Sequence, residues 1–147
     1  MSLARLLYIS KATKLLSEDE LLAIHATCQA KNARRHVTGL LLYSSGNFMQ
    51  LLEGPTFIVG ELFDTICHDR RHTEVQRLVF ETAKERLFPE WGMGMLNLDK
   101  QSELDRSRLA SILQEIQQSG NATIGAKKAL ALLHEFRHQL PTVKDAA

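Results

Sequence analysis

The sequence predicts an α+β fold built on a sheet covered on both faces, and three observations support this prediction. Two apolar runs, Val37–Tyr43 and Phe48–Leu52, flank the turn Ser44–Asn47, whose glycine suits a β-hairpin. Both runs are apolar on both faces, which is typical of central strands buried between layers. Stretches with apolar residues at helical spacing precede and follow the hairpin. Strands and helices therefore alternate along the chain.

Before the hairpin, the chain is expected to form one strand and one helix. The strand covers Leu3–Ser10. The helix covers residues 17–31, because Ser17–Glu20 form a capping box whose acidic side chains suit the positive end of a helix. Asn32 then lies at the C-terminal end of this helix, on the stripe that continues from Ile24.

After the hairpin, a second helix and a fourth strand are expected. Gly54–Thr56 ends the second hairpin strand and begins the helix, since proline is favoured in a first helical turn. The helix ends near His68–His72. The strand covers Val75–Ala83, with Leu78 and Phe80 on one face.

The last elements complete the expected architecture. A fifth strand covers Trp91–Leu98, and two further helices cover residues 102–118 and 123–140. The order β-α-β-β-α-β-β is ferredoxin-like, with a five-stranded mixed sheet and its two helices on one face. The two C-terminal helices are expected to cover the other face. We therefore expect the sheet and its first two helices over residues 1–100 and a helical cap over 101–147, packed on the same domain.

Composition narrows the class of protein. The chain has 147 residues and a net charge of +1, with scattered basic residues, which fits one domain without attraction to nucleic acid. No apolar run is long enough to cross a bilayer, and the N-terminus lacks a signal-peptide pattern. Neither the six histidines nor Cys28 and Cys67 have metal-ligand spacing. We expect reduced thiols, a cytoplasmic location, no membrane and no metal.

Gln50 is the residue that indicates a site, because it is an amide in an apolar strand. Alternation places it on the same face as Phe48. A buried amide without a partner costs about 1–3 kcal/mol, so Gln50 needs one. The first and third strands of this fold are neighbours, and Tyr8 can therefore contact Gln50.

Several polar or oxidisable residues are expected near this pair, from the ends of both helices and from the fifth strand. They are Asn32, Asp69, Arg71, His72, Trp91 and Met93. A phenol beside an amide beneath two helices suits a flat polar heterocycle. Asn32 would hydrogen bond to its edge, while Ile24 and Ile66 contact its faces. Each of these residues, taken singly, is more often a core or capping residue. The prediction of a binding site therefore depends on their joint pattern.

With these residues in place, the chain resembles the BLUF domain, a flavin-binding blue-light sensor. The matching motifs follow the family's order and spacing over roughly residues 1–100. They are Arg5–Ser10, Gln29–Asn32, Val37–Tyr43, Phe48–Gly54, Asp69–His72 and Phe88–Met93. The two terminal helices match only in type, as the cap of short single-domain members.

The resemblance implies that a flavin lies between the first two helices without a covalent link. FAD is the family's usual chromophore, and FMN stays open. The implied cofactor-binding residues are Tyr8, Ile24, Cys28, Lys31, Asn32, Gln50, Ile66, Asp69, Arg71 and His72. Lys31 departs from the family, which often has asparagine or histidine there. A lysine can extend toward a phosphate or point to solvent.

The resemblance also implies a photochemical mechanism rather than enzyme catalysis. The implied photoactive residues are Tyr8, Ser10, Gln50, Trp91 and Met93. Blue light would drive electron and proton transfer from Tyr8, and Gln50 would rotate or tautomerise. A reversible red-shifted state would then signal through protein–protein contacts, either by homo-oligomerisation or with a separate downstream partner.

Two other classes of function stay open on the sequence alone. One is a small-molecule-binding module or an acylphosphatase-like enzyme on the same fold, although the connector Lys11–Lys14 lacks the glycine-rich anion loop that such an enzyme needs. The other is a protein-interaction module without photochemistry, which would purify colourless. RNA binding by the sheet is rejected, because exposed aromatic residues with flanking basic residues are missing.

Overall fold

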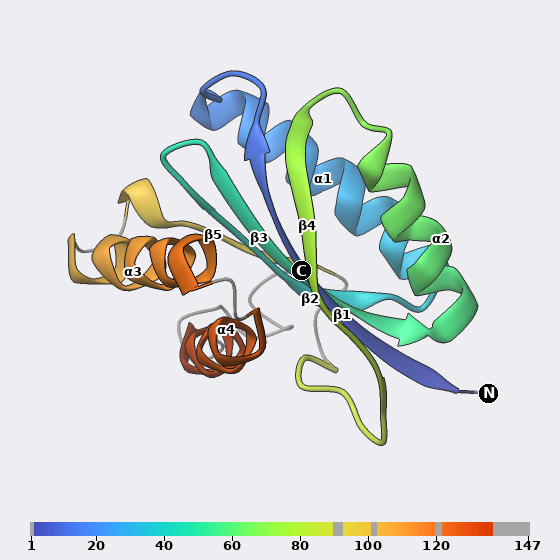
Figure 1. Cartoon of the computed structure of the whole chain (residues 1–147). Coiled ribbons are helices and arrows are strands. Elements are labelled where there is room, and N and C mark those ends of the chain that lie inside the picture. Colours follow the sequence, from blue (N-terminus) through green and yellow to red (C-terminus); the bar gives the residue numbers. More distant parts are fainter. Residues whose placement is uncertain (1, 90–92, 101–102, 120–121, 137–147) are drawn as a thin grey trace.

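The computed structural model describes residues 2–89, 93–100, 103–119 and 122–136 and confirms the predicted layered architecture. Helices α1 and α2 cover one face of a five-stranded sheet, and α3 and α4 cover the other (Figure 1). The elements are β1 (Leu3–Ala12), α1 (Glu18–Arg34), β2 (Thr38–Ser44), β3 (Asn47–Pro55), α2 (Thr56–Cys67), β4 (His72–Ala83), β5 (Gly94–Asn97), the 3₁₀ turn η1 (Leu98–Lys100), α3 (Glu103–Ser119) and α4 (Ala122–Phe136).

The strand order is β4-β1-β3-β2-β5, so β1 and β3 are neighbours near the centre of the sheet. β1 is antiparallel to both β3 and β4, β2 is antiparallel to β3, and β2 is parallel to β5. The sheet is therefore mixed, as predicted. The register places Tyr8 directly opposite Gln50.

The hairpin has the local chemistry that its sequence predicts. Ser45 and Gly46 form the two-residue turn, with φ of 48° and 84° respectively. The Asp99 carboxylate accepts a hydrogen bond from the Ser45 N–H at 3.0 Å, which fastens the turn to η1. Gly39 is required in β2, because a Cβ atom there would lie 1.8 Å from the carbonyl oxygen of Leu51.

Helix α1 begins with the predicted capping box. The Glu20 N–H donates to Ser17 Oγ at 3.2 Å, and the Ser17 N–H donates to Glu20 Oε1 at 3.1 Å. The helix continues to Arg34, about one turn farther than expected, and Asn32 therefore lies inside its last turn.

Two hydrophobic cores lie on the two faces of the sheet. The core beneath α1 and α2 contains Leu6, Tyr8, Leu21, Val37, Leu41, Tyr43, Phe48, Leu52, Val59 and Met93. The core beneath α3 and α4 contains Leu7, Ile9, Leu40, Leu42, Met49, Leu51, Phe88, Leu96, Leu98, Leu109, Ile112, Ile116, Ala129, Leu132, Leu133 and Phe136. The double covering explains why the central strands are apolar on both faces.

Two sequence expectations at the sheet edges were wrong. β5 covers Gly94–Asn97 instead of residues 91–98, so Met93 precedes the strand, and Trp91 lies outside the described residues. In β4, Leu78 packs against the core beneath α3 and α4, whereas the Phe80 ring lies beside Gly60 of α2. The register of β1 against β4 shifts by a bulge at this point, which breaks simple alternation.

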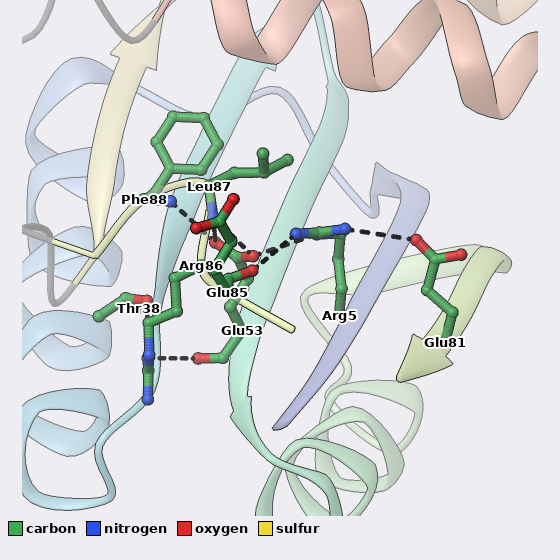
Figure 2. A network of polar contacts seen from close by, with 8 residues as sticks. All are labelled: Arg5, Thr38, Glu53, Glu81, Glu85, Arg86, Leu87 and Phe88. Atoms are coloured by element: carbon green, nitrogen blue, oxygen red, sulfur yellow. Dashed lines mark hydrogen bonds and ion pairs between the residues drawn. The ribbon is translucent and has the colours of Figure 1, made fainter. Parts of the chain in front are cut away.

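A buried carboxylate fastens the start of the connection between β4 and β5 to the sheet (Figure 2). Glu53 of β3 is fully buried. Its carboxylate accepts hydrogen bonds from the N–H groups of Leu87 and Phe88 at 2.9 Å and from Arg5 Nε at 3.1 Å. Arg86 donates to the Glu53 carbonyl at 3.0 Å. Residues 86–88 are thereby held against β3, five to seven residues before Met93 in the sequence.

Neither a membrane-spanning helix nor a metal cluster is found in the described part of the chain. No helix there combines the length and the apolar composition that a bilayer crossing needs. No group of three or more histidine, cysteine, aspartate or glutamate side chains there lies close enough to hold a metal ion.

Candidate functional site

A pocket lies between α1, α2 and the sheet face that carries Tyr8 and Gln50. It is lined by Tyr8, Ile24, Thr27, Cys28, Lys31, Asn32, Arg35, Leu41, Phe48, Gln50, Leu52, Leu62, Thr65, Ile66, Asp69, Arg71 and His72. The structure therefore brings together all ten residues that the sequence proposed for cofactor binding. They come from β1, α1, β3, α2, the connection between α2 and β4, and the first residue of β4, His72.

A chain of contacts runs from Tyr8 through Gln50 to Met93. The Tyr8 hydroxyl donates a hydrogen bond to Gln50 Oε1. The other end of the amide donates from Nε2 to the Met93 sulfur at 3.4 Å. All three side chains are buried, with exposed fractions of 1%, 3% and 0%. The amide orientation follows from these partners, because a phenol donates to a carbonyl oxygen and a thioether can only accept.

Tyr8 is held protonated by its surroundings. Burial raises the pKa of its phenol far above the ordinary value, because removal from water penalises the phenolate. Its ring packs against Phe63, with a centroid distance of 5.7 Å. The hydroxyl proton therefore stays on Tyr8 in the resting state, pointing at Gln50.

Ser10 and His72 form a second polar pair at the same end of the sheet. Ser10 Oγ lies 2.9 Å from His72 Nδ1. Burial lowers the pKa of His72, so the imidazole is neutral near pH 7. Its ring lies edge-on to Tyr8 at 6.3 Å and beside Phe48 at 4.8 Å. Ser10, predicted as photoactive, thus contacts the pocket through His72 and does not itself line it.

Asn32 presents a buried amide to the pocket. Its exposed fraction is 3%. Its backbone carbonyl is used by the N–H groups of Arg35 at 3.1 Å and Val37 at 3.0 Å, which close the end of α1. The described residues give its side chain no hydrogen-bond partner. A buried amide of this kind is suited to a ligand with both donor and acceptor groups on one edge.

Charged side chains from the ends of both helices also line the pocket. Asp69 accepts hydrogen bonds from Arg71 Nη2 at 2.7 Å and from the Arg71 N–H at 2.9 Å. The hydrogen-bonded guanidinium lowers the pKa of Asp69, so this carboxylate is ionised. Lys31 and Arg35 contribute two further cationic groups at the end of α1.

Cys28 lines the pocket as a neutral thiol, because burial raises its pKa. Cys67 is exposed, and neither cysteine forms a disulfide. The thiol and the side chains of Ile24 and Ile66 give the pocket an apolar lining between its polar ends.

Seven lining residues were missed by the sequence reasoning. They are Thr27, Arg35, Leu41, Phe48, Leu52, Leu62 and Thr65. Alternation from Gln50 would have found Phe48 and Leu52, since all three share one strand face. No sequence pattern indicated that Arg35 lines the pocket, because it lies beyond the expected end of the helix.

The chemistry of this lining fits a flat heterocycle with one polar edge. Apolar side chains of α1 and α2 can contact its faces, and the Asn32 amide can pair with its edge. The cationic side chains that line the pocket can pair with an anionic substituent. Fold and pocket together define a small ligand-binding domain.

Comparison with known proteins identifies the family. A family model described as sensors of blue-light using FAD matches residues 3–94. The chain belongs to this family, the BLUF blue-light flavin sensors.

The curated relatives are much longer than the region that they share with this chain. The chain is 42% identical over 91 residues to the photoactivated adenylate cyclase subunit beta of Euglena gracilis, covering 61% of this chain and 11% of that one. It is 38% identical over 68 residues to the blue light- and temperature-regulated antirepressor BluF of Escherichia coli strain K12, covering 46% and 17% respectively. The chain therefore spans a small part of the curated relatives that it matches.

Solved structures agree with the sequence comparison. A bacterial light-regulated adenylyl cyclase matches with a TM-score of 0.71 and 40% identity, over 80% of this chain and 35% of that one. BlrB, a BLUF protein solved in its dark state, matches with a TM-score of 0.69 and 28% identity, over 89% of this chain and 96% of that one.

Proposed function

We propose that this chain binds FAD without a covalent bond between α1 and α2, and that Tyr8, Gln50 and Met93 form its light switch. The contact chain from the Tyr8 hydroxyl through the Gln50 amide to the Met93 sulfur is the observation that carries the proposal. FAD is chosen over FMN because the family description names it.

The binding roles follow from the lining. Asn32 pairs with the polar edge of the ring, and Ile24 and Ile66 contact its faces. Lys31 and Arg71 lie where a cation can neutralise a phosphate group, with Arg71 oriented by Asp69. Cys28 and His72 complete the lining as neutral groups.

A bound flavin, when it absorbs blue light, becomes an oxidant strong enough to take an electron and a proton from a neighbouring donor. Tyr8 is the nearest donor to the amide, and its proton already points to Gln50 Oε1. If the excited flavin took an electron from Tyr8, the phenol would become a strong acid and would pass its proton to Gln50 Oε1.

Gln50 converts this proton transfer into a lasting change. Once protonated at Oε1, the amide could rotate and then return this proton, or it could keep the proton as an imidic tautomer and release one of its Nε2 protons instead. Either proton would restore Tyr8 when the electron returns from the flavin. Rotation exchanges the positions of Oε1 and Nε2, so an oxygen then faces the Met93 sulfur where an N–H group stood. Neither outcome makes a bond to the cofactor, and the protein should therefore return to its resting state in darkness.

We further propose that the chain acts as a sensor without catalytic activity of its own. The matched family is one of sensors, and the matched region is 11% of the cyclase subunit beta of Euglena gracilis. Residues 1–100 would form the sensor and 101–147 the cap. The signal would leave through a homo-oligomer contact or a separate protein partner. The two free thiols fit a cytoplasmic location.

The switch is tested with matched variants of the reconstituted protein. Gln50→Leu and Tyr8→Phe should bind flavin and lose the light-induced red shift, because one lacks the amide and the other lacks the proton. Thr27→Val is the control, since Thr27 lines the same pocket but its hydroxyl donates only to the Ala23 carbonyl, at 3.0 Å. A normal red shift in Gln50→Leu would refute the proposed switch. Chromatography of the extracted chromophore decides between FAD and FMN.

A further inference from the structure

Met93 packs in the core beneath α1 and α2 and also makes two hydrogen bonds, of which only one belongs to the switch described above. Its sulfur accepts from Gln50 Nε2 at 3.4 Å. Its backbone carbonyl lies 2.6 Å from Nε2 of His25, a half-buried residue of α1. A carbonyl oxygen can only accept, so the imidazole carries its proton on Nε2 and donates it to Met93.

His25 reaches Met93 from the helix that also lines the pocket. It lies next to Ile24 and one helical turn before Cys28, both of which line the pocket, but it does not line the pocket itself. Its side chain is therefore free to reach past the pocket to the segment that enters β5. This hydrogen bond joins α1 directly to the residue that contacts Gln50.

The start of the connection between β4 and β5 is also fixed. The buried Glu53 carboxylate holds Leu87 and Phe88 against β3 (Figure 2), and from Gly94 onward β5 is paired with β2. Met93 lies between these two fixed points, where its carbonyl is hydrogen-bonded to His25.

We propose that His25 is a positioning residue of the light switch: its hydrogen bond to the Met93 carbonyl holds the Met93 sulfur against Gln50 and couples rearrangement of that amide to α1. The inference rests on the proposed function of Gln50. If the amide rotates, its oxygen faces the Met93 sulfur. Both atoms can only accept hydrogen bonds, so no hydrogen bond can form between them. Met93 is pushed away from Gln50, and the hydrogen bond transmits this displacement to α1.

Three variants of the full chain separate this role from simple packing. His25→Phe keeps a planar ring and removes the donor. His25→Gln restores an N–H group at a position close to that of Nε2, and it should rescue the function. His68→Phe is the matched control, because His68 Nδ1 also lies 2.8 Å from a backbone carbonyl, that of Asp64, at an exposed site away from Met93.

The first measurement is made in the dark and needs no photochemistry. Protein labelled with ¹³C at the methionine methyl groups is compared by NMR, with the Met93 signal assigned from Met93→Leu. His25→Phe should shift or split the Met93 signal and leave that of buried Met49 in place, while His25→Gln and His68→Phe keep the native Met93 signal. An unchanged Met93 signal in His25→Phe overturns the proposal.

The second measurement follows dark recovery after blue light. His25→Phe should slow recovery about fivefold, the factor that corresponds to one hydrogen bond of ordinary net strength. A native rate in His25→Phe, or a His25→Gln variant that behaves like His25→Phe, overturns the proposal. Absence of any red shift in the wild-type protein would instead refute the proposed function, and the dark NMR comparison would still decide the role of His25.

Discussion

Replacing Glu53 tests how strongly the buried carboxylate stabilises the fold. In the native chain its two oxygens accept from three N–H groups, those of Arg5 Nε, Leu87 and Phe88. Glu53→Ala leaves these donors without their partner. Breaking a buried charged pair on one side costs about 3–5 kcal/mol, and an orphaned buried N–H costs about 1–3 kcal/mol. Since these costs overlap, we expect a loss of about 4 kcal/mol.

This loss converts into a measurable shift in melting temperature. For a chain of this size, each 1 kcal/mol lowers Tm by roughly 2–4 °C, so Glu53→Ala should melt about 8–16 °C below the wild type. Glu53→Gln keeps the shape and one acceptor but places its NH₂ group against a donor, and about 2 kcal/mol should be lost. Thermal melts followed by circular dichroism, together with urea titrations, give both values.

The control for Glu53 is an exposed ion pair. Lys128 pairs with Glu115 at 2.8 Å, with side-chain exposed fractions of 54% and 33%. Lys128→Ala should cost less than about 1 kcal/mol, as exposed pairs usually do. If Glu53→Ala also stayed within 1 kcal/mol of the wild type, the carboxylate would not hold the connection as described.

Three further predictions concern the pocket and the sheet. Asn32→Ala should weaken FAD binding at least about tenfold in a fluorescence titration, because the polar edge of the ring loses its amide partner, and an unchanged Kd would contradict this role. Burial lowers the folded-state pKa of His72 below its ordinary 6.5, so the unfolded chain binds a proton first as the pH falls. The free energy of unfolding should therefore decrease as the pH is lowered through about 6.5. Urea titrations at several pH values should show a weaker pH dependence in His72→Gln than in the wild type. Gly39→Ala should lower the free energy of unfolding by about 3 kcal/mol or more, because its Cβ would lie 1.8 Å from the Leu51 carbonyl oxygen. Gly60→Ala is the control and should be neutral or stabilising, because the nearest atom to its Cβ would lie 3.8 Å away. Equal urea midpoints for these two variants would contradict the geometry.

The sequence contained enough information to predict the layers of the fold and the contact between Tyr8 and Gln50. Apolar runs without alternation indicated central strands, and the known adjacency of the first and third strands brought Tyr8 and Gln50 together. The capping box at Ser17 fixed the start of α1. These predictions succeeded because each rests on local chemistry or on a topology that few alternatives share.

The features that could not be predicted from the sequence depend on tertiary packing. Nothing in the neighbourhood of His25 indicates a partner, because that partner is a backbone carbonyl 68 residues away. Arg35 reaches the pocket only because α1 extends beyond the expected end. The bulge opposite Leu7 and Tyr8 places Leu78 and Phe80 differently from simple alternation, and bulges have no strong sequence signal here.

The most direct test of the central claim is the visible absorption spectrum of the wild-type protein before and after blue light. If Tyr8 and Gln50 form the switch, the flavin bands should move slightly to the red and return in darkness without loss of amplitude. A flavin spectrum that bleaches, or that stays in place under illumination, would contradict the account.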